Sequence, residues 1–332
     1  MKVLVTGGGG FLGLALCRAL QAQGYTVRSI QRRDSAALRE LGVEQVLGDL
    51  ANAEAMRAAV SGVDAIVHNA AMAGAWGPYQ DYYRANVLGT RNVLQAARAA
   101  GVRKVVYTST PSVTHRATHP VAGLSAAQVP YGEGLRAPYA ATKKLAEIEA
   151  LAANDASLAV TALRPRLIWG AGDNHLLPRL VERSRAGRLR LIGSGDNLID
   201  STYVTNAANA HVRALQALEP GSRNAGKAYF ISNGEPRSMK DTVNALLDAA
   251  GEPPVSQHIP AAVAMAAAHV MQAAYRGLPL RGEPLLTPFV VEQMLTTHWY
   301  DMTPAREDFG YVPAVSFDQG IEQLRRSFRM TA

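Results

Sequence analysis

The first thirteen residues constrain the fold of this chain more than any other stretch. Residues 2–6 form an apolar run that predicts a strand, four glycines follow, and residues 14–20 have the apolar pattern of a helix. Glycines spaced in this way let backbone N–H groups approach a phosphate, and the helix N-terminus adds a partial positive charge. The order of strand, glycine turn and helix predicts a dinucleotide site, with a merely tight turn as the alternative. The residues expected to contact the dinucleotide here are Gly7, Gly10, Phe11, Leu12 and Gly13.

The alternation of strand and helix continues through the first half of the chain. Further strands are expected over residues 25–30, 43–47, 63–67, 104–108 and 160–163, and helices over 53–60, 82–100 and 139–149. Strands that alternate with helices predict an α/β fold with a doubly wound parallel sheet of the Rossmann type.

This alternation ends near residue 165, which predicts a smaller second lobe. Helix 176–186 and strands 189–192 and 198–204 are expected there, whereas an apolar strand at 227–232 is expected to return to the main sheet. The predicted division is therefore an NADP-binding domain of residues 1–165, joined by 205–234, and an interleaved substrate lobe of 166–204 and 235–332. A chain of 332 residues is long enough for both parts.

Two arginines follow the second expected strand, where a dinucleotide fold often has an acidic residue for the ribose 2′-hydroxyl. The sequence there is Gln31, Arg32 and Arg33. Guanidinium groups hold a 2′-phosphate through charge-assisted hydrogen bonds, so the pattern favours NADP(H) over NAD(H). Asp34 argues against this preference, and a solvated strand end is the alternative.

Residues after the third and fourth strands are expected at the rim of the same crevice. Asp49, followed by Leu50, could accept a hydrogen bond from the adenine amine, although a helix N-cap is nearly as plausible. Small residues such as Ala70 permit a close approach of the cofactor. His68 is interpreted as a hydrogen-bonded core histidine rather than a catalyst.

A candidate catalytic pair lies on the helix expected after Pro138. Tyr139 and Lys143 are four residues apart and so share one helical face, where the ammonium is expected to lower the phenol pKa. The fifth strand delivers Ser109, Thr110 and Ser112 to the edge of the sheet where ligands bind. A tyrosine with a tuned pKa beside these hydroxyls predicts general acid and base chemistry.

Composition excludes several other classes of protein. The net charge is +7, but the arginines are scattered rather than gathered with aromatic residues, so nucleic-acid binding is not expected. The single Cys17 and the loop of residues 115–120 predict no metal site. Lys2 precedes only three apolar residues, which predicts no secretory signal and a cytoplasmic protein.

Residues 259–275 are rich in alanine, methionine and valine. This stretch is shorter than the roughly twenty residues that cross a bilayer, so no transmembrane segment is expected. A buried or substrate-lining helix is favoured, and an interfacial contact with a membrane or a partner stays open.

Several motifs together resemble the extended short-chain dehydrogenase/reductases, and within them the 3β-hydroxysteroid dehydrogenase/isomerase branch. The motifs are residues 6–13, 49–50, 86–90, 107–110, 139–143 and 164–165. The resemblance implies a carbonyl/alcohol redox reaction with Tyr139 as proton donor or acceptor and Lys143 on the nicotinamide ribose. Thr110 replaces the usual serine that orients the substrate oxygen, and Asn86 matches an asparagine that supports a proton relay. Pro165 and Ile168 match the segment beside the nicotinamide.

A closer resemblance, carried by residues 110–118, 163–170, 173–179 and 298–300, is to bacterial reductases that act on 2-alkyl-3-oxoalkanoic acids in long-chain olefin biosynthesis. It implies NADPH as cofactor and a fatty 3-oxo acid as substrate, whose carboxylate needs a cation. The candidates for that cation are Arg116, Arg136, Arg166 and Arg179. A homodimer through the helices near 82–100 and 139–153 and association with other enzymes of the olefin pathway are also expected. The alternatives are a 3β-hydroxysteroid or sugar-nucleotide oxidoreductase and a non-catalytic NADP(H) sensor.

Overall fold

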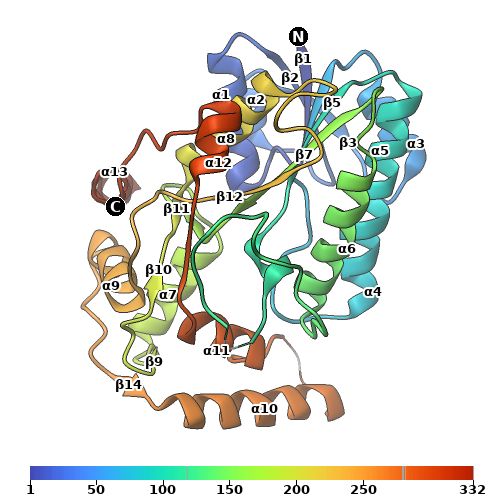
Figure 1. Cartoon of the computed structure of the whole chain (residues 1–332). Helices are drawn as coiled ribbons and strands as arrows, with labels where there is room; N and C mark the ends of the chain where they lie inside the picture. Colours follow the sequence, from blue (N-terminus) through green and yellow to red (C-terminus); the bar gives the residue numbers. More distant parts are fainter. Residues whose placement is uncertain (118, 279, 281, 332) are drawn as a thin grey trace.

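The computed structural model describes residues 1–117, 119–278, 280 and 282–331, and a seven-stranded parallel sheet lies at its centre (Figure 1). The strands lie in the order β12–β7–β5–β4–β1–β2–β3. They are β1 (Lys2–Thr6), β2 (Thr26–Gln31), β3 (Glu44–Leu47), β4 (Ala65–His68), β5 (Lys104–Thr108), β7 (Ala159–Pro165) and β12 (Ala228–Ile231). The chain order reverses between β1 and β4, and ligands of open α/β sheets bind at the carboxyl ends of strands at such a point. The predicted fold class is confirmed, and so is the return of the strand at 227–232 to the main sheet.

Helices cover both faces of this sheet (Figure 1). They include α1 (Phe11–Ala22), α2 (Ala36–Glu40), α3 (Ala53–Val60), α4 (Tyr79–Tyr82), α5 (Gly89–Ala99), α6 (Pro138–Ala152), α8 (Val204–Ala217) and α12 (Thr303–Phe309). Val3 and Val5 of β1 are buried in one apolar cluster with α1 and α8, whereas Leu4 is buried in another with α3, α5 and α6. Side chains that alternate in this way are those of a strand buried on both faces.

Two expected elements differ in the structure. The helix predicted over 82–100 consists of α4, a π-helical segment (Tyr83–Leu88) and α5. The strand predicted over 198–204 is instead β10 (Leu198–Ile199) and β11 (Thr202–Tyr203), followed by α8, which was not expected. The buried Asp200 separates the two strands, because its carboxylate accepts hydrogen bonds from Ser232 and from the backbone N–H of Gly234.

The second lobe lies below the carboxyl ends of the main strands in Figure 1. Its strands are β6 (Val121–Leu124), β8 (Ile168–Trp169), β9 (Leu191–Ile192), β10, β11, β13 (Arg237–Ser238), β14 (His258–Ile259) and β15 (His298–Tyr300). Its helices are α7 (Leu176–Arg185), α9 (Met239–Ala249), α10 (Ala261–Gly277), α11 (Pro288–Leu295) and α13 (Phe317–Thr331). One four-stranded sheet has the order β13–β10–β15–β6. Its β6 comes from the part of the chain that the predicted division assigned to the nucleotide-binding domain.

Helix α10 runs along the bottom of the molecule in Figure 1. Of the two alternatives expected for residues 259–275, a buried helix was wrong, whereas part of this helix does line a cavity. Only Ala264 and Ala268 of this helix are buried, and they pack on Ile192 and Val291. Across the part of the chain that the structure describes, no helix has both the length and the apolar character to cross a membrane.

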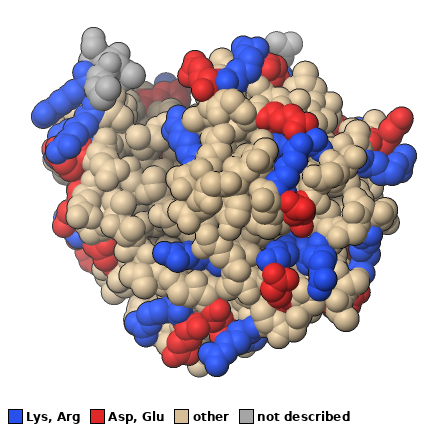
Figure 2. All heavy atoms as spheres, turned by 90° about the horizontal axis from the view of Figure 1, so that it is seen from above, with Lys and Arg blue, Asp and Glu red and all other residues tan. Residues whose placement is uncertain are grey.

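Charged residues of both signs are interspersed on the face of the molecule that Figure 2 shows. Among the described residues, no three histidine, cysteine, aspartate or glutamate side chains are grouped as a metal site would need.

Candidate active site

The glycine turn after β1 has no room for larger side chains at two positions. A Cβ added to Gly13 would lie 2.0 Å from the carbonyl oxygen of Gly7, and one added to Gly8 would lie 2.3 Å from Ser29 Oγ. Gly7 has a φ of +71°, which also favours glycine. The turn therefore needs Gly7 and Gly13, as predicted, and also Gly8, which was not singled out.

The N-terminus of α1 offers donors to an anion. Its N-cap residue, Gly10, has no side chain that could cap the first N–H groups, and Phe11 and Leu12 begin the helix. The first N–H groups of a helix have no partner within it, so they suit a pyrophosphate. Ala70 lies beside the turn, because a Cβ on Gly7 would come within 3.0 Å of the Ala70 Cβ. These residues fit a bound dinucleotide.

The end of β2 presents two free cations. Arg32 and Arg33 are exposed, and neither has an ion-pair partner among the described residues. Asp34, which argued against NADP(H), is paired with Arg39 at 2.7 Å. Its negative charge is therefore largely compensated, and the pair of arginines fits a 2′-phosphate.

The alternative role of Asp49 as a helix cap was wrong. Asn52 caps α3 with its side chain, whereas Asp49 Oδ1 accepts a hydrogen bond from the backbone N–H of Ala51. Asn92 fixes the backbone beside it by donating to the carbonyl of Leu50 at 2.8 Å. Asp49 thus stays partly exposed at the rim of the crevice.

A chain of hydrogen bonds joins the glycine turn to the π-helical segment. The N–H of Ala70 donates to Thr6 Oγ1, which lies 2.8 Å from His68 Nδ1, and His68 Nε2 lies 2.9 Å from Thr90 Oγ1. Thr90 in turn donates to the carbonyl oxygen of Asn86. We assign the ring proton of His68 to Nε2, because the Thr6 hydroxyl, which accepts from the backbone, is then free to donate to Nδ1. The interpretation of His68 as a hydrogen-bonded core residue is confirmed.

Asn86 is buried in the π-helical segment, a type of irregularity that is frequent at functional sites. Its side chain accepts from the N–H of Met72 and donates to Thr142 Oγ1, at 2.7 and 3.0 Å. The asparagine is thereby held between the loop after β4 and the start of α6.

The hydroxyl groups expected around the reacting carbonyl gather where β5 ends. Thr110 caps the short 3₁₀-helix Pro111–Thr114, and its Oγ1 lies 3.2 Å from Ser112 Oγ. Ser109 Oγ is buried and has no hydrogen-bond partner among the described residues. Tyr139 is half-buried in the first turn of α6, and burial raises its pKa while hydrogen bonding by Thr110 opposes the shift. Thr110 and Tyr139 therefore meet, as predicted.

The expectation that Lys143 lowers the pKa of Tyr139 was wrong, because the pKa of Tyr139 is raised and Lys143 binds other groups. Its Nζ donates to the carbonyl of Thr108 at 2.7 Å and lies 4.1 Å from the centre of the Tyr107 ring. Burial lowers the pKa of Lys143 to about 7, against the opposing effect of Glu147. Tyr139 with a raised pKa keeps its proton at neutral pH.

Pro165 ends β7 and Ile168 begins β8, so both lie where the main sheet passes into the second lobe. Leu167 between them has a φ of +40°, which is uncommon for a residue other than glycine.

A cavity of about 750 Å³ has Ala137 and Pro138, the two residues before Tyr139, in its wall, whereas Tyr139 itself does not line it. The wall also includes Trp76, His115, Arg116, Arg136, Tyr275, Arg276, Phe289 and Glu292. Of the four arginines proposed for a carboxylate, Arg116 and Arg136 line the cavity, whereas Arg166 and Arg179 are bonded to side chains of the second lobe. Arg276 was missed, because it lies one residue beyond the stretch of 259–275 that was expected to be buried or to line the substrate site.

A second polar network crosses the cavity wall and was also missed. His115 Nε2 lies 2.7 Å from Glu292 Oε2, and Gln293 Nε2 lies 2.7 Å from His115 Nδ1. Arg166 donates to the other end of the Gln293 amide. No local signal in the sequence joins residues that are 177 positions apart. Thr118, at the end of the 110–118 motif, lies outside the residues that the structure describes.

Comparisons with known proteins agree with this geometry. The family model described as 3-beta hydroxysteroid dehydrogenase/isomerase matches residues 4–260. The chain belongs to this family. It is therefore an oxidoreductase of the extended short-chain dehydrogenase/reductase type, and the resemblance seen in the sequence is confirmed.

Two curated members of the family are similar over nearly the whole chain. A 2-alkyl-3-oxoalkanoate reductase of Stenotrophomonas maltophilia is 58% identical, with 98% of this chain and 99% of that protein covered. One of Shewanella oneidensis is 43% identical, with 97% and 85% covered. A solved structure of a double mutant of DesIV, a dTDP-glucose 4,6-dehydratase of Streptomyces venezuelae with NAD bound, is 25% identical and superposes with a TM-score of 0.76 over 99% of this chain and 97% of that one.

Buried histidines predict that this enzyme loses stability in mild acid. Burial lowers the pKa of His68 and of His298 to about 3 and that of His211 to about 4. Between those values and about 6.5 the unfolded chain binds protons that the folded one does not, so stability falls as the pH falls. From pH 7 to pH 5 each histidine costs about 2 kcal/mol by this linkage. Burial raises the pKa of Asp200 to about 6, so this carboxyl binds a proton in the folded protein as the pH falls and offsets a smaller part of the loss in stability.

Urea unfolding at the two pH values measures this loss. The variant His211→Gln removes one titrating group, so the difference in unfolding free energy between pH 7 and pH 5 should shrink by about 2 kcal/mol. A difference that is the same in the variant and the native protein would contradict the assignment.

Proposed function

We propose that this protein uses NADPH to reduce the 3-oxo group of 2-alkyl-3-oxoalkanoic acids, giving 2-alkyl-3-hydroxyalkanoic acids. The observation that carries the proposal is the meeting of Tyr139 and Thr110 at the carboxyl edge of the sheet. The two residues before Tyr139 line a cavity with three arginines that have no ion-pair partner among the described residues. The names of the two bacterial relatives support the choice of substrate.

The residues of this chain supply the proton and the orientation. When bound, the reduced nicotinamide supplies the hydride that reaches C3 of the acid. Thr110 donates a hydrogen bond to the carbonyl oxygen, and Tyr139, whose raised pKa keeps it protonated, gives its proton to the oxygen as the alkoxide forms. Lys143 would leave the Thr108 carbonyl to hold the nicotinamide ribose, while Asn86 supports the return of a proton to Tyr139.

The carboxylate of the substrate is assigned to the cavity. Arg116, Arg136 and Arg276 line it, and none has an ion-pair partner among the residues that the structure describes. Two carboxylates, those of Glu133 and Glu292, also line the cavity, and Glu292 is held by His115. A cavity with unpaired guanidinium groups suits an acid better than a neutral sterol.

The arginines after β2 should decide between NADPH and NADH. Replacing both Arg32 and Arg33 by alanine removes two charge-assisted contacts to the 2′-phosphate, so the KM for NADPH should rise about tenfold or more. The KM for NADH should change little. Steady-state kinetics with both cofactors measures this change. The matched control is Arg103→Ala, because Arg103 is exposed and directly precedes β5, at the amino ends of the strands. An equal effect on the two cofactors would contradict the NADP(H) assignment.

We further propose a cytoplasmic homodimer formed through α6 and the segment from the π-helix to α5. Leu88, Leu145 and Ile148 on these elements are exposed apolar side chains. Association with other enzymes of olefin biosynthesis, which the resemblance in the sequence implied, belongs to the same proposal.

The reaction is tested by the fall in NADPH absorbance with a freshly hydrolysed 2-alkyl-3-oxo acid. Its methyl ester is the matched control, because it has the same carbon chain without the negative charge. Turnover of the acid with a higher KM for the ester is expected. Turnover of a 3-hydroxysteroid or a UDP-sugar, with none of the acid, would overturn the proposal.

A further inference from the structure

We propose that α10 rests on the surface of a lipid bilayer that carries anionic headgroups, and that fatty substrate enters the cavity from this side. The second part rests on the proposed function, whereas the first does not. The helix is too short to span a bilayer, so it would lie in the plane of the interface.

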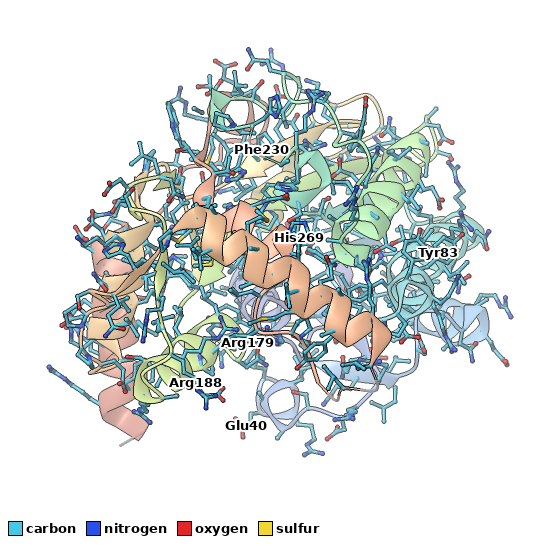
Figure 3. All side chains as sticks on the ribbon, turned by 90° about the horizontal axis from the view of Figure 1, so that it is seen from below. Glu40, Tyr83, Arg179, Arg188, Phe230 and His269 are labelled. Atoms are coloured by element: carbon cyan, nitrogen blue, oxygen red, sulfur yellow. The ribbon has the colours of Figure 1, made fainter. Side chains whose placement is uncertain are left out.

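The outer side of α10 is apolar and uncovered. Val263 and Val270 are 54% and 69% exposed, and their spacing of seven residues places them on one face. Leu278 and Leu280 continue the exposed apolar surface beyond the helix. Figure 3 shows α10 lying across this face with no other element over it. Arg276 is the one lysine, arginine, aspartate or glutamate in the helix.

Cations flank this apolar surface. Arg276 stands at the end of the helix, and the exposed Arg179 and Arg188 lie to one side of α10 in Figure 3, with Arg188 the more distant of the two. Arg179 is paired with Glu283 at 3.3 Å, whereas Arg188 and Arg276 have no ion-pair partner among the described residues. Apolar side chains bordered by arginines match the interface of a membrane with anionic lipids. A second copy of the chain fits less well, because a symmetric contact through this face would bring the same arginines together.

The same helix forms part of the cavity wall. Gln272, Tyr275 and Arg276 line the cavity, and Tyr275 contacts Trp76 edge to face at a distance of 6.0 Å between ring centres. The lipid-facing side and the cavity side are thus two sides of one helix. An acid with two alkyl chains partitions into bilayers, so an opening beside α10 would receive it directly from the lipid.

Vesicle flotation of the full chain tests the contact. We expect the protein to float with vesicles of phosphatidylglycerol and phosphatidylethanolamine and to bind vesicles of phosphatidylcholine far less. The double variant Val263→Asp and Val270→Asp should lower binding to the anionic vesicles by about tenfold or more. Val312→Asp is the matched control, because Val312 is 64% exposed in the loop after α12, and it should bind as the native protein does.

Three results would overturn the proposal: no flotation with the anionic vesicles, equal flotation of the double variant, or dissociation of an oligomer by the double variant in size-exclusion chromatography. The last would make α10 a contact between subunits. Turnover of a short, water-soluble 2-alkyl-3-oxo acid without lipid should be the same in the double variant and the native protein. If the proposed function is wrong, the turnover assay alone shows it, and the binding of the protein to vesicles is unchanged.

Discussion

Replacing Tyr139 by phenylalanine is expected to lower kcat about a thousandfold, because it removes the proton donor and keeps the ring. Binding of NADPH should be unchanged, since the glycine turn and the arginines after β2 are far from the phenol hydroxyl along the sheet edge. The hydride can then reach C3 only as fast as water protonates the forming alkoxide. Steady-state kinetics and NADPH fluorescence titration measure the two effects separately.

The matched control for this change is Tyr79→Phe, which removes a phenol hydroxyl from an exposed residue of α4. Its kcat should stay within about twofold of the native value. Turnover of the Tyr139 variant at the native rate would show that another group supplies the proton.

Replacing Glu147 by glutamine is expected to cost about 3 kcal/mol of unfolding free energy or more, because it leaves a buried guanidinium without its counter-ion. Glu147 is fully buried, and the Arg164 side chain is 3% exposed. Two nitrogens of Arg164 donate to the carboxylate, at 2.5 and 3.0 Å, and the Tyr131 hydroxyl donates to it at 2.7 Å. Urea unfolding at pH 7 measures the loss.

The control is the neighbouring ion pair between Glu149 of α6 and Arg91 of α5. Glu149 binds Arg91 with similar geometry, but these side chains are 31% and 42% exposed, so Glu149→Gln should cost below about 1 kcal/mol. The double variant Glu147→Leu and Arg164→Met should recover most of the stability, since it buries no charge. Equal losses for Glu147→Gln and Glu149→Gln would contradict this interpretation of the buried pair.

The features that depend on local sequence patterns could be predicted. Apolar runs and the glycine turn were sufficient for the parallel sheet, and the spacing of Tyr139 and Lys143 placed both on α6. The surroundings of Lys143 were not predictable, because its contact with the Thr108 carbonyl depends on how α6 packs against β5.

Features built from distant residues were also beyond the sequence. The pair of His115 and Glu292 joins the end of the 3₁₀-helix after β5 to α11, and β6 pairs with β15 across more than half of the chain. The π-helical segment that contains Asn86 has no characteristic residue type by which the sequence could have revealed it. Helix α10 was expected to be buried or to line the substrate site, because alanine, valine and methionine suit either position, and its composition does not say which side packs.

The most direct test of the central claim follows the hydrogen that reaches the substrate. The native enzyme would be given NADPH deuterated at C4 of the nicotinamide and a 2-alkyl-3-oxo acid, and the product would be analysed by mass spectrometry and NMR. We expect a 2-alkyl-3-hydroxy acid with one deuterium at C3 and its carboxylate retained. A product without deuterium at C3, or no product while NADPH remains bound, would contradict the proposed reduction.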